Sequence, residues 1–140
     1  ITIAAAFGIG RALEKTGTAA LIASALLEIA VSLGPVGLLA AVYLVTSFFS
    51  EMISNVAAVA LVFPISHEVA FQFGVDPRPF AIAVTVAASS SFVLPLGYQT
   101  NLMVYGAGGY SFSDFVKIGL PLKSILFLVS MLCIPHVWPL

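Results

Sequence analysis

Charged side chains are scarce in this sequence. Only 8% of its 140 residues are Asp, Glu, Lys or Arg, whereas 61% are hydrophobic. A typical soluble domain carries about 25% charged residues, so the composition argues against a water-soluble fold and predicts an integral membrane protein surrounded by lipid. The few charges nearly cancel, to a net charge of −1. The sequence therefore offers no basic surface for nucleic acid, and we expect no nucleic-acid partner.

Cysteine is almost absent as well. Cys133 stands alone, so the chain forms no internal disulfide and has no cysteine cluster for a metal. His67 and Glu68 are adjacent, but Phe71 occupies the position where a metalloprotease helix carries its second histidine. We therefore predict no resident cofactor and no hydrolytic zinc site.

The sequence also lacks an initiating methionine, a basic leader region and a small-residue cleavage site. We interpret it as a piece of a longer protein. Glycines and a short run of charges interrupt residues 1–33, which we expect to contain the end of one membrane span and then an interfacial helix. Gly34 and Pro35 end that helix and begin the next one.

Between Pro35 and Gly74 the charged residues are Glu51 and Glu68, and Glu51 is far from either end. About 20 helical residues cross a bilayer, so residues 35–73 are too long for one span. The polar pair Ser54-Asn55 in their middle carries no sign of an exposed loop. We predict a re-entrant hairpin whose tip lies inside the protein, because non-helical backbone at membrane depth must be buried or face a wet cavity.

The stretch from Pro79 to Ser113 contains no charged residue and is again too long for one straight span. Pro95 and Gly97 should interrupt a helix in its middle. We therefore predict a discontinuous helix over residues 79–108. Its break leaves free carbonyls, which favour a cation, and free amides, which favour an anion. Such breaks indicate the binding site of a secondary transporter.

A final span is predicted over residues 114–138, with Ser111 or Ser113 as its cap and Trp138 at a membrane interface. Lys117 and Lys123 come at the beginning of this span, so we expect neither lysine to reach the breaks. An anion bound there would need its charge balanced by cations.

Two runs carry a resemblance to a known family. "SEMISNVAAVALVFPI" followed by "ASSSFVLPLGYQTNLMVYGAGGYSFSDFVKIGLPL" resembles the C-terminal half of the divalent anion:sodium symporters, and the second run resembles the sulfate-permease-like branch most. The resemblance covers essentially residues 1–140. It implies an all-α membrane protein built from two inverted repeats, of which this chain is one. It also implies an N-terminal half as partner, a homodimer, and a multi-pass location in the plasma (inner) membrane.

The resemblance also implies a site and an activity. The activity is transport of sulfate or a di- or tricarboxylate by alternating access, with sodium as coupling ion. The implied anion-binding residues are Ser54, Asn55, Val56, Tyr98, Gln99, Thr100 and Asn101. The implied sodium-binding residues are Ser50, Ile53, Asn55 and Gly97. Val56 departs from the family signature, which has Thr there, so one hydroxyl contact to the anion is missing.

Other interpretations of these residues remain open from the sequence. Ser54 and Asn55 suit a helix cap or a polar contact between helices. Glu51 is either structural or a cation ligand. Ser89, Ser90 and Ser91 are better explained by helix packing than by ligand binding. An ion channel or another ion-transporter-superfamily antiporter would use the same kind of break. An intramembrane protease is disfavoured, because the sequence has no nucleophile motif and no paired intramembrane aspartates.

Overall fold

The computed structural model of the chain describes residues 16, 25, 34–95 and 98–140. These residues are helical or irregular, with no strand among them. The helices are α3 (Gly34–Met52), α4 (Asn55–Phe73), α5 (Pro77–Ala88), α6 (Gln99–Ala107) and α7 (Phe112–Val137). Of these, α3, α4 and α7 are long and apolar enough to cross a membrane. The all-α expectation is confirmed for this part of the chain, whereas the elements predicted for 1–33 lie outside the described residues, apart from positions 16 and 25.

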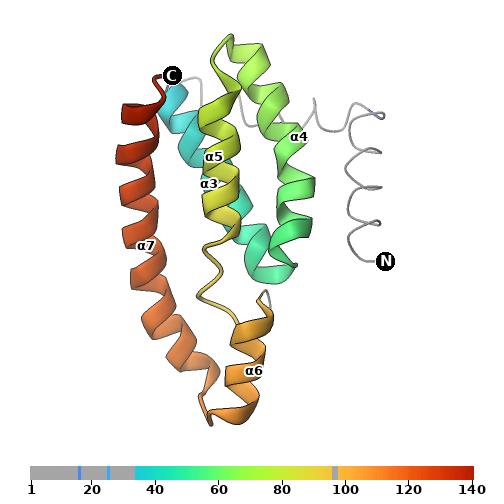
Figure 1. The fold of residues 1–140 in the computed structure, drawn as a ribbon, viewed down its shortest axis with the longest axis vertical. Coiled ribbons are helices and arrows are strands. Elements are labelled where there is room, and N and C mark those ends of the chain that lie inside the picture. The colour runs from blue at the N-terminus through green and yellow to red at the C-terminus, as the bar shows by residue number, and fades with distance from the viewer. Residues whose placement is uncertain (1–15, 17–24, 26–33, 96–97) are drawn as a thin grey trace.

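Helices α3 and α4 form a hairpin. Figure 1 shows α3 running toward the tip and α4 returning beside it, so the start of α3 and the end of α4 lie at the same end of the molecule. The turn is short because Ser54 caps α4 directly: its Oγ accepts a hydrogen bond from Ala57 N at 3.3 Å. Gly74, with φ of +66°, closes α4 in the left-handed conformation that glycine adopts without strain.

Helix α5 packs against both arms of the hairpin. Asp76 caps it by accepting from Arg78 N at 2.9 Å, and Pro77 occupies its first turn. The helix ends at Ala88, and α6 begins only at Gln99. The described residues between them are not helical. Figure 1 shows the described part of this connection as an irregular loop that leads from the end of α5 toward α6.

The buried core lies where α3, α4 and α5 meet. Leu38 and Val42 from α3, Val69 from α4 and Phe80 from α5 are almost completely buried. Helix α7 joins this core through an edge-to-face contact between Tyr43 and Phe127, whose ring centroids are 5.3 Å apart. A packed centre of this kind fixes the hairpin relative to the end of α5.

Helix α7 begins two residues before the predicted span, at Phe112, because Ser111 and Asp114 form a capping box. It continues through Gly119 and Pro121 without ending. Its exposed side chains are largely apolar, as Leu128 and Leu132 illustrate, and an apolar surface of this kind suits lipid. Figure 1 shows that α6 and the adjoining half of α7 extend beyond the tip of the α3–α4 hairpin.

Candidate functional site

The tip of the hairpin and the end of α5 meet through hydrogen bonds. Ser50 Oγ, in the last turn of α3, donates to Asn55 Oδ1 at 3.0 Å. Ser91 Oγ, just beyond α5, lies 3.0 Å from the same Asn55 oxygen and 3.0 Å from the Ser50 carbonyl oxygen. The two hydroxyls also contact each other at 2.5 Å. Sequence positions about forty residues apart therefore form one polar cluster.

The serine side of this cluster is buried and lies at two helix carboxyl ends, whereas Asn55 is half-buried. The hydroxyls of Ser50 and Ser91 both contact the carbonyl oxygen of Ala88, the last residue of α5. Ser50 is 0% exposed and Ser91 2% exposed. The carboxyl ends of helices carry partial negative charge, so this position favours a cation.

Asn101 extends the cluster toward α6. Its Nδ2 donates to the Ser91 carbonyl at 2.9 Å, across the non-helical connection. The first turn of α6 is thereby tied to the end of α5. Asn101 also lines a cavity of about 310 Å³ between the connection, α6 and α7.

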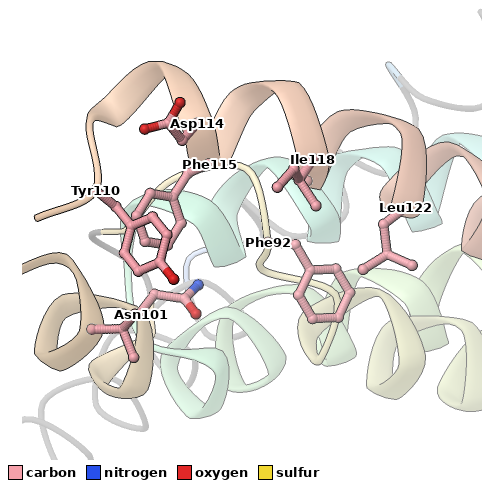
Figure 2. A pocket seen from close by; sticks show the side chains of 9 residues that line it. Phe92, Asn101, Tyr110, Asp114, Phe115, Ile118 and Leu122 are labelled. Carbon is pink, nitrogen blue, oxygen red and sulfur yellow. The ribbon is translucent and has the colours of Figure 1, made fainter. Parts of the chain in front are cut away.

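Figure 2 shows that Asn101, Tyr110 and Phe115 gather at one part of this cavity, with Phe92, Ile118 and Leu122 lining another. Most of these side chains are apolar. Apolar surroundings do not replace the hydration of a divalent anion, so this cavity does not suit the anion that the sequence suggested.

The structure corrects our expectation for Lys123. Its Nζ lies 2.8 Å from Glu51 Oε1 and also donates to the Ser47 carbonyl at 3.2 Å. The helix of α7 begins early and passes beside the tip of the hairpin, so Lys123 reaches this region without any displacement. A lysine therefore does lie next to the break, but a carboxylate already neutralises it.

Both oxygens of the Glu51 carboxylate accept hydrogen bonds. Oε1 accepts from Lys123 and from Val93 N at 3.3 Å, and Oε2 accepts from Leu94 N at 2.8 Å. Glu51 thus binds the backbone amides of the non-helical connection and links them to α7. These contacts correspond to the structural alternative for Glu51. A cavity of about 610 Å³ borders this ion pair, lined largely by apolar side chains.

Other predicted site residues lie nearer the surface. Ile53, Ser54 and Val56 at the hairpin tip are exposed, and so are Tyr98 and Thr100 beside α6. Ser54 also caps α4, which was the competing explanation for it. Gly97 lies outside the described residues, and so does the side chain of Gln99. The structure therefore brings together Ser50, Asn55 and Asn101 of the predicted set.

Two residues join the site that sequence reasoning assigned elsewhere. Ser91 was attributed to packing and Lys123 to the start of a distant span, yet both contact residues of the hairpin tip. Ser91 did carry a signal, because it lies just before Pro95, where the helix had to end. The place of Lys123 depends on how α7 packs against α3, which no local pattern reveals.

Comparison with known proteins places the chain in a family. A family model described as citrate transporter matches residues 1–138. The chain belongs to the citrate transporter family. The relatives of this chain carry names consistent with the divalent anion:sodium symporters, which confirms the resemblance seen in the sequence.

Three relatives illustrate the range of sequence identity. The chain is 47% identical over 126 residues to an uncharacterized transporter of Synechocystis, covering 90% of the chain and 21% of that relative. It is 42% identical over 131 residues to sodium/sulfate cotransporter 1 of Chlamydomonas reinhardtii, covering 93% of the chain and 15% of that relative. It is 30% identical over 132 residues to sodium-dependent high-affinity dicarboxylate transporter 2 of Caenorhabditis elegans, covering 94% of the chain and 24% of that relative. The chain thus spans a quarter or less of these relatives' lengths.

Proposed function

We propose that this chain is one half of a secondary transporter that carries a divalent or multivalent anion across a membrane together with sodium. The anion is sulfate or a di- or tricarboxylate, because the relatives' names include sulfate and dicarboxylate and the family model is described as citrate transporter. The other partners are the lipid bilayer, an N-terminal half with the inverse topology, and a second copy of the protein. We assign the transporter to the plasma (inner) membrane.

One observation supports this proposal most. The tip of the α3–α4 hairpin and the interruption between α5 and α6 meet in a largely buried polar cluster at Ser50, Asn55 and Ser91. Two interrupted helical elements that present helix ends to one point are the arrangement from which secondary transporters build ion and substrate sites.

In this proposal, sodium binds on the side of the helix carboxyl ends. Its ligands come from Ser50, Ile53, Asn55 and Gly97. Hydroxyl, amide and carbonyl oxygens suit a hard cation, so the donor set of the cluster fits sodium. Asn55 Oδ1 faces the two serine hydroxyls, whereas Asn55 Nδ2 donates to none of the residues that the structure describes. That amide nitrogen is therefore free to donate to an anion.

The anion lies on the exposed side of the tip. Its contacts come from Ser54, Asn55, Val56, Tyr98, Gln99, Thr100 and Asn101. Val56 brings no hydroxyl, so the other half of the transporter supplies a larger share of the polar contacts. Because Glu51 neutralises Lys123, the charge of the anion is balanced by bound sodium rather than by a lysine of this half.

The hairpin is re-entrant in this proposal. Its two arms have their outer ends on the same side, and α6 and part of α7 extend beyond its tip (Figure 1). A tip that stops short of the far end of the molecule lies within the membrane when α7 spans it. Alternating access then exposes the tip and the interruption to each side in turn.

Uptake into proteoliposomes by the complete transporter tests the proposal. With sulfate, citrate or succinate outside, we expect uptake that saturates and that collapses when sodium chloride is replaced by choline chloride at constant ionic strength. Asn55→Ala should abolish sodium-dependent uptake while membrane insertion stays normal, because alanine removes a ligand without adding a polar group.

Three outcomes would contradict the proposal. Uptake that does not saturate with anion concentration would indicate a channel. Uptake that is unchanged in choline chloride would exclude sodium coupling. Normal sodium-dependent uptake by well-inserted Asn55→Ala would return Asn55 to a purely structural contact between helices.

A further inference from the structure

The polar cluster at the hairpin tip makes more close oxygen–oxygen contacts than it has hydrogens to bridge them. Five oxygens take part: the hydroxyl and carbonyl oxygens of Ser50, Asn55 Oδ1, the Ala88 carbonyl oxygen and Ser91 Oγ. They make six close contacts with one another. Each serine hydroxyl has one hydrogen, and the amide and carbonyl oxygens have none. Two hydrogens therefore serve six contacts, and most contacts bring acceptors together without a hydrogen between them.

The surroundings do not supply the missing hydrogens. Among the described residues, no N–H group donates to Asn55 Oδ1, and the Ser50 carbonyl accepts only from Ser91. The carbonyls of Ser50 and Ala88 belong to the carboxyl ends of α3 and α5, where intrahelical donors run out. A largely buried, donor-poor set of oxygens is costly unless a positive charge compensates it.

Ser91 is central to this set. Its hydroxyl contacts the other four oxygens at 2.5–3.3 Å. We propose that Ser91 is a ligand of the coupling cation, in addition to the residues that the sequence suggested. This inference rests on the proposed sodium coupling, and it adds a hydroxyl from beyond α5 to a site whose other side chains come from the hairpin.

The adjacent serine provides a matched control. Ser90 is also 2% exposed, but its Oγ donates to the Val86 carbonyl at 2.7 Å and lies 3.5 Å from the Tyr43 hydroxyl. It has no hydrogen bond to the oxygens of the cluster. Ser90→Ala and Ser91→Ala therefore make the same chemical change at equal burial, and only the second removes a proposed ligand.

The first measurement is sodium binding, independent of transport. In the purified complete transporter without anion, thermal unfolding is followed as sodium chloride replaces choline chloride at constant ionic strength. Ligand binding to the folded state raises the unfolding temperature. We expect Ser91→Ala to raise the sodium concentration for half-maximal stabilisation about tenfold or more, the effect of losing one contact to a charged group. Ser90→Ala should leave that concentration unchanged.

The second measurement is cation selectivity of sulfate uptake. A ligand contacts the ion directly, so Ser91→Ala should change the ratio of uptake in sodium to uptake in lithium. A serine with only a structural role would lower uptake by the same factor in both ions. Ser91→Cys can replace Ser91→Ala in both measurements if the alanine variant does not insert into the membrane. The thiol keeps the side-chain volume and replaces a hard oxygen by a soft sulfur.

The results separate this inference from the proposed function. If the unmodified transporter shows no sodium-dependent stabilisation or uptake, the proposed sodium coupling is wrong whatever Ser91 does. If the unmodified transporter depends on sodium but Ser91→Ala and Ser90→Ala have the same sodium affinity and the same selectivity, Ser91 is not a ligand and the proposed function stands.

Discussion

At the scale of single residues, the ion pair of Glu51 and Lys123 is the main electrostatic feature of the described structure. The side chains are 6% and 20% exposed, and the carboxylate also binds two backbone amides. A buried pair is weak evidence for stability as such, but removing one partner leaves an uncompensated charge. The pair therefore acts as a positioning device, holding the connection between α5 and α6 against α3 and α7.

This role predicts the effect of Lys123→Met. We expect it to destabilise the folded protein by about 3 kcal/mol, because the Glu51 carboxylate is left without its counter-charge. The double variant Glu51→Gln with Lys123→Met should recover much of that loss, since no charge remains buried alone. The measurement is the midpoint of thermal unfolding in detergent for each variant.

Arg78 provides the control for this charge removal. Its pair with Asp76 has a separation of 3.9 Å, and the two side chains are 77% and 41% exposed. Exposed pairs contribute about 0–1 kcal/mol, so Arg78→Met should leave the unfolding midpoint nearly unchanged. Equal effects of Arg78→Met and Lys123→Met would show that burial of the Glu51 pair is unimportant. A double variant less stable than Lys123→Met would also contradict the pairing.

At the scale of elements, the contact between α7 and the α5–α6 connection depends on a glycine. A Cβ placed on Gly119 would overlap the carbonyl group of Phe92 and lie 2.9 Å from Val93 Cα. These atoms are backbone and cannot rotate away. Glycine at this position lets α7 approach the connection closely, and so brings Lys123 within reach of Glu51.

Gly119→Ala should therefore separate α7 from the connection. We expect a loss of about 1–3 kcal/mol in stability, the usual cost of overpacking, together with weaker sodium-dependent uptake. The control is Gly106→Ala in α6, where an added Cβ meets nothing within 4 Å. That change should leave stability equal or slightly higher, because alanine favours helix over glycine. Gly119→Ala protein with normal stability and uptake would show that the close approach is not required.

At the scale of the whole molecule, the arrangement of the helices in Figure 1 predicts which segments lie on the same side of the membrane. The start of α3, the end of α4 and the end of α7 lie at one end, and the turn between α6 and α7 lies at the other. Three exposed positions sample these ends: Val36 in the first turn of α3, Asp76 after α4, and Ser111 before α7.

Single cysteines at these positions test the topology, in a background where Cys133 is replaced by serine. A membrane-impermeant maleimide should label Val36→Cys and Asp76→Cys from the same side and Ser111→Cys from the opposite side. Labelling of positions 36 and 76 from opposite sides would mean that the hairpin crosses the membrane once, and the re-entrant hypothesis would be wrong.

Several features follow from the sequence alone. The scarcity of charge places the chain in a membrane, because only lipid tolerates so much apolar surface. Gly74, Asp76, Pro77 and the Ser111–Asp114 box locate helix ends, since capping depends on neighbouring residues. The two polar interruptions at Ser54-Asn55 and around Pro95 are likewise visible as local departures from a helical pattern. Helix capping and helix interruption depend on residues close together in the chain, so they can be predicted from the sequence.

The contacts between these interruptions were decided by tertiary structure. Ser91 reaches Ser50 and Asn55 because α5 packs against both hairpin arms and ends at the level of the tip. Lys123 reaches Glu51 because Gly119 lets α7 lie directly against the connection. Residues separated by 41 and 72 positions meet only when helices pack, and packing depends on the shapes of whole helix faces rather than on any local pattern.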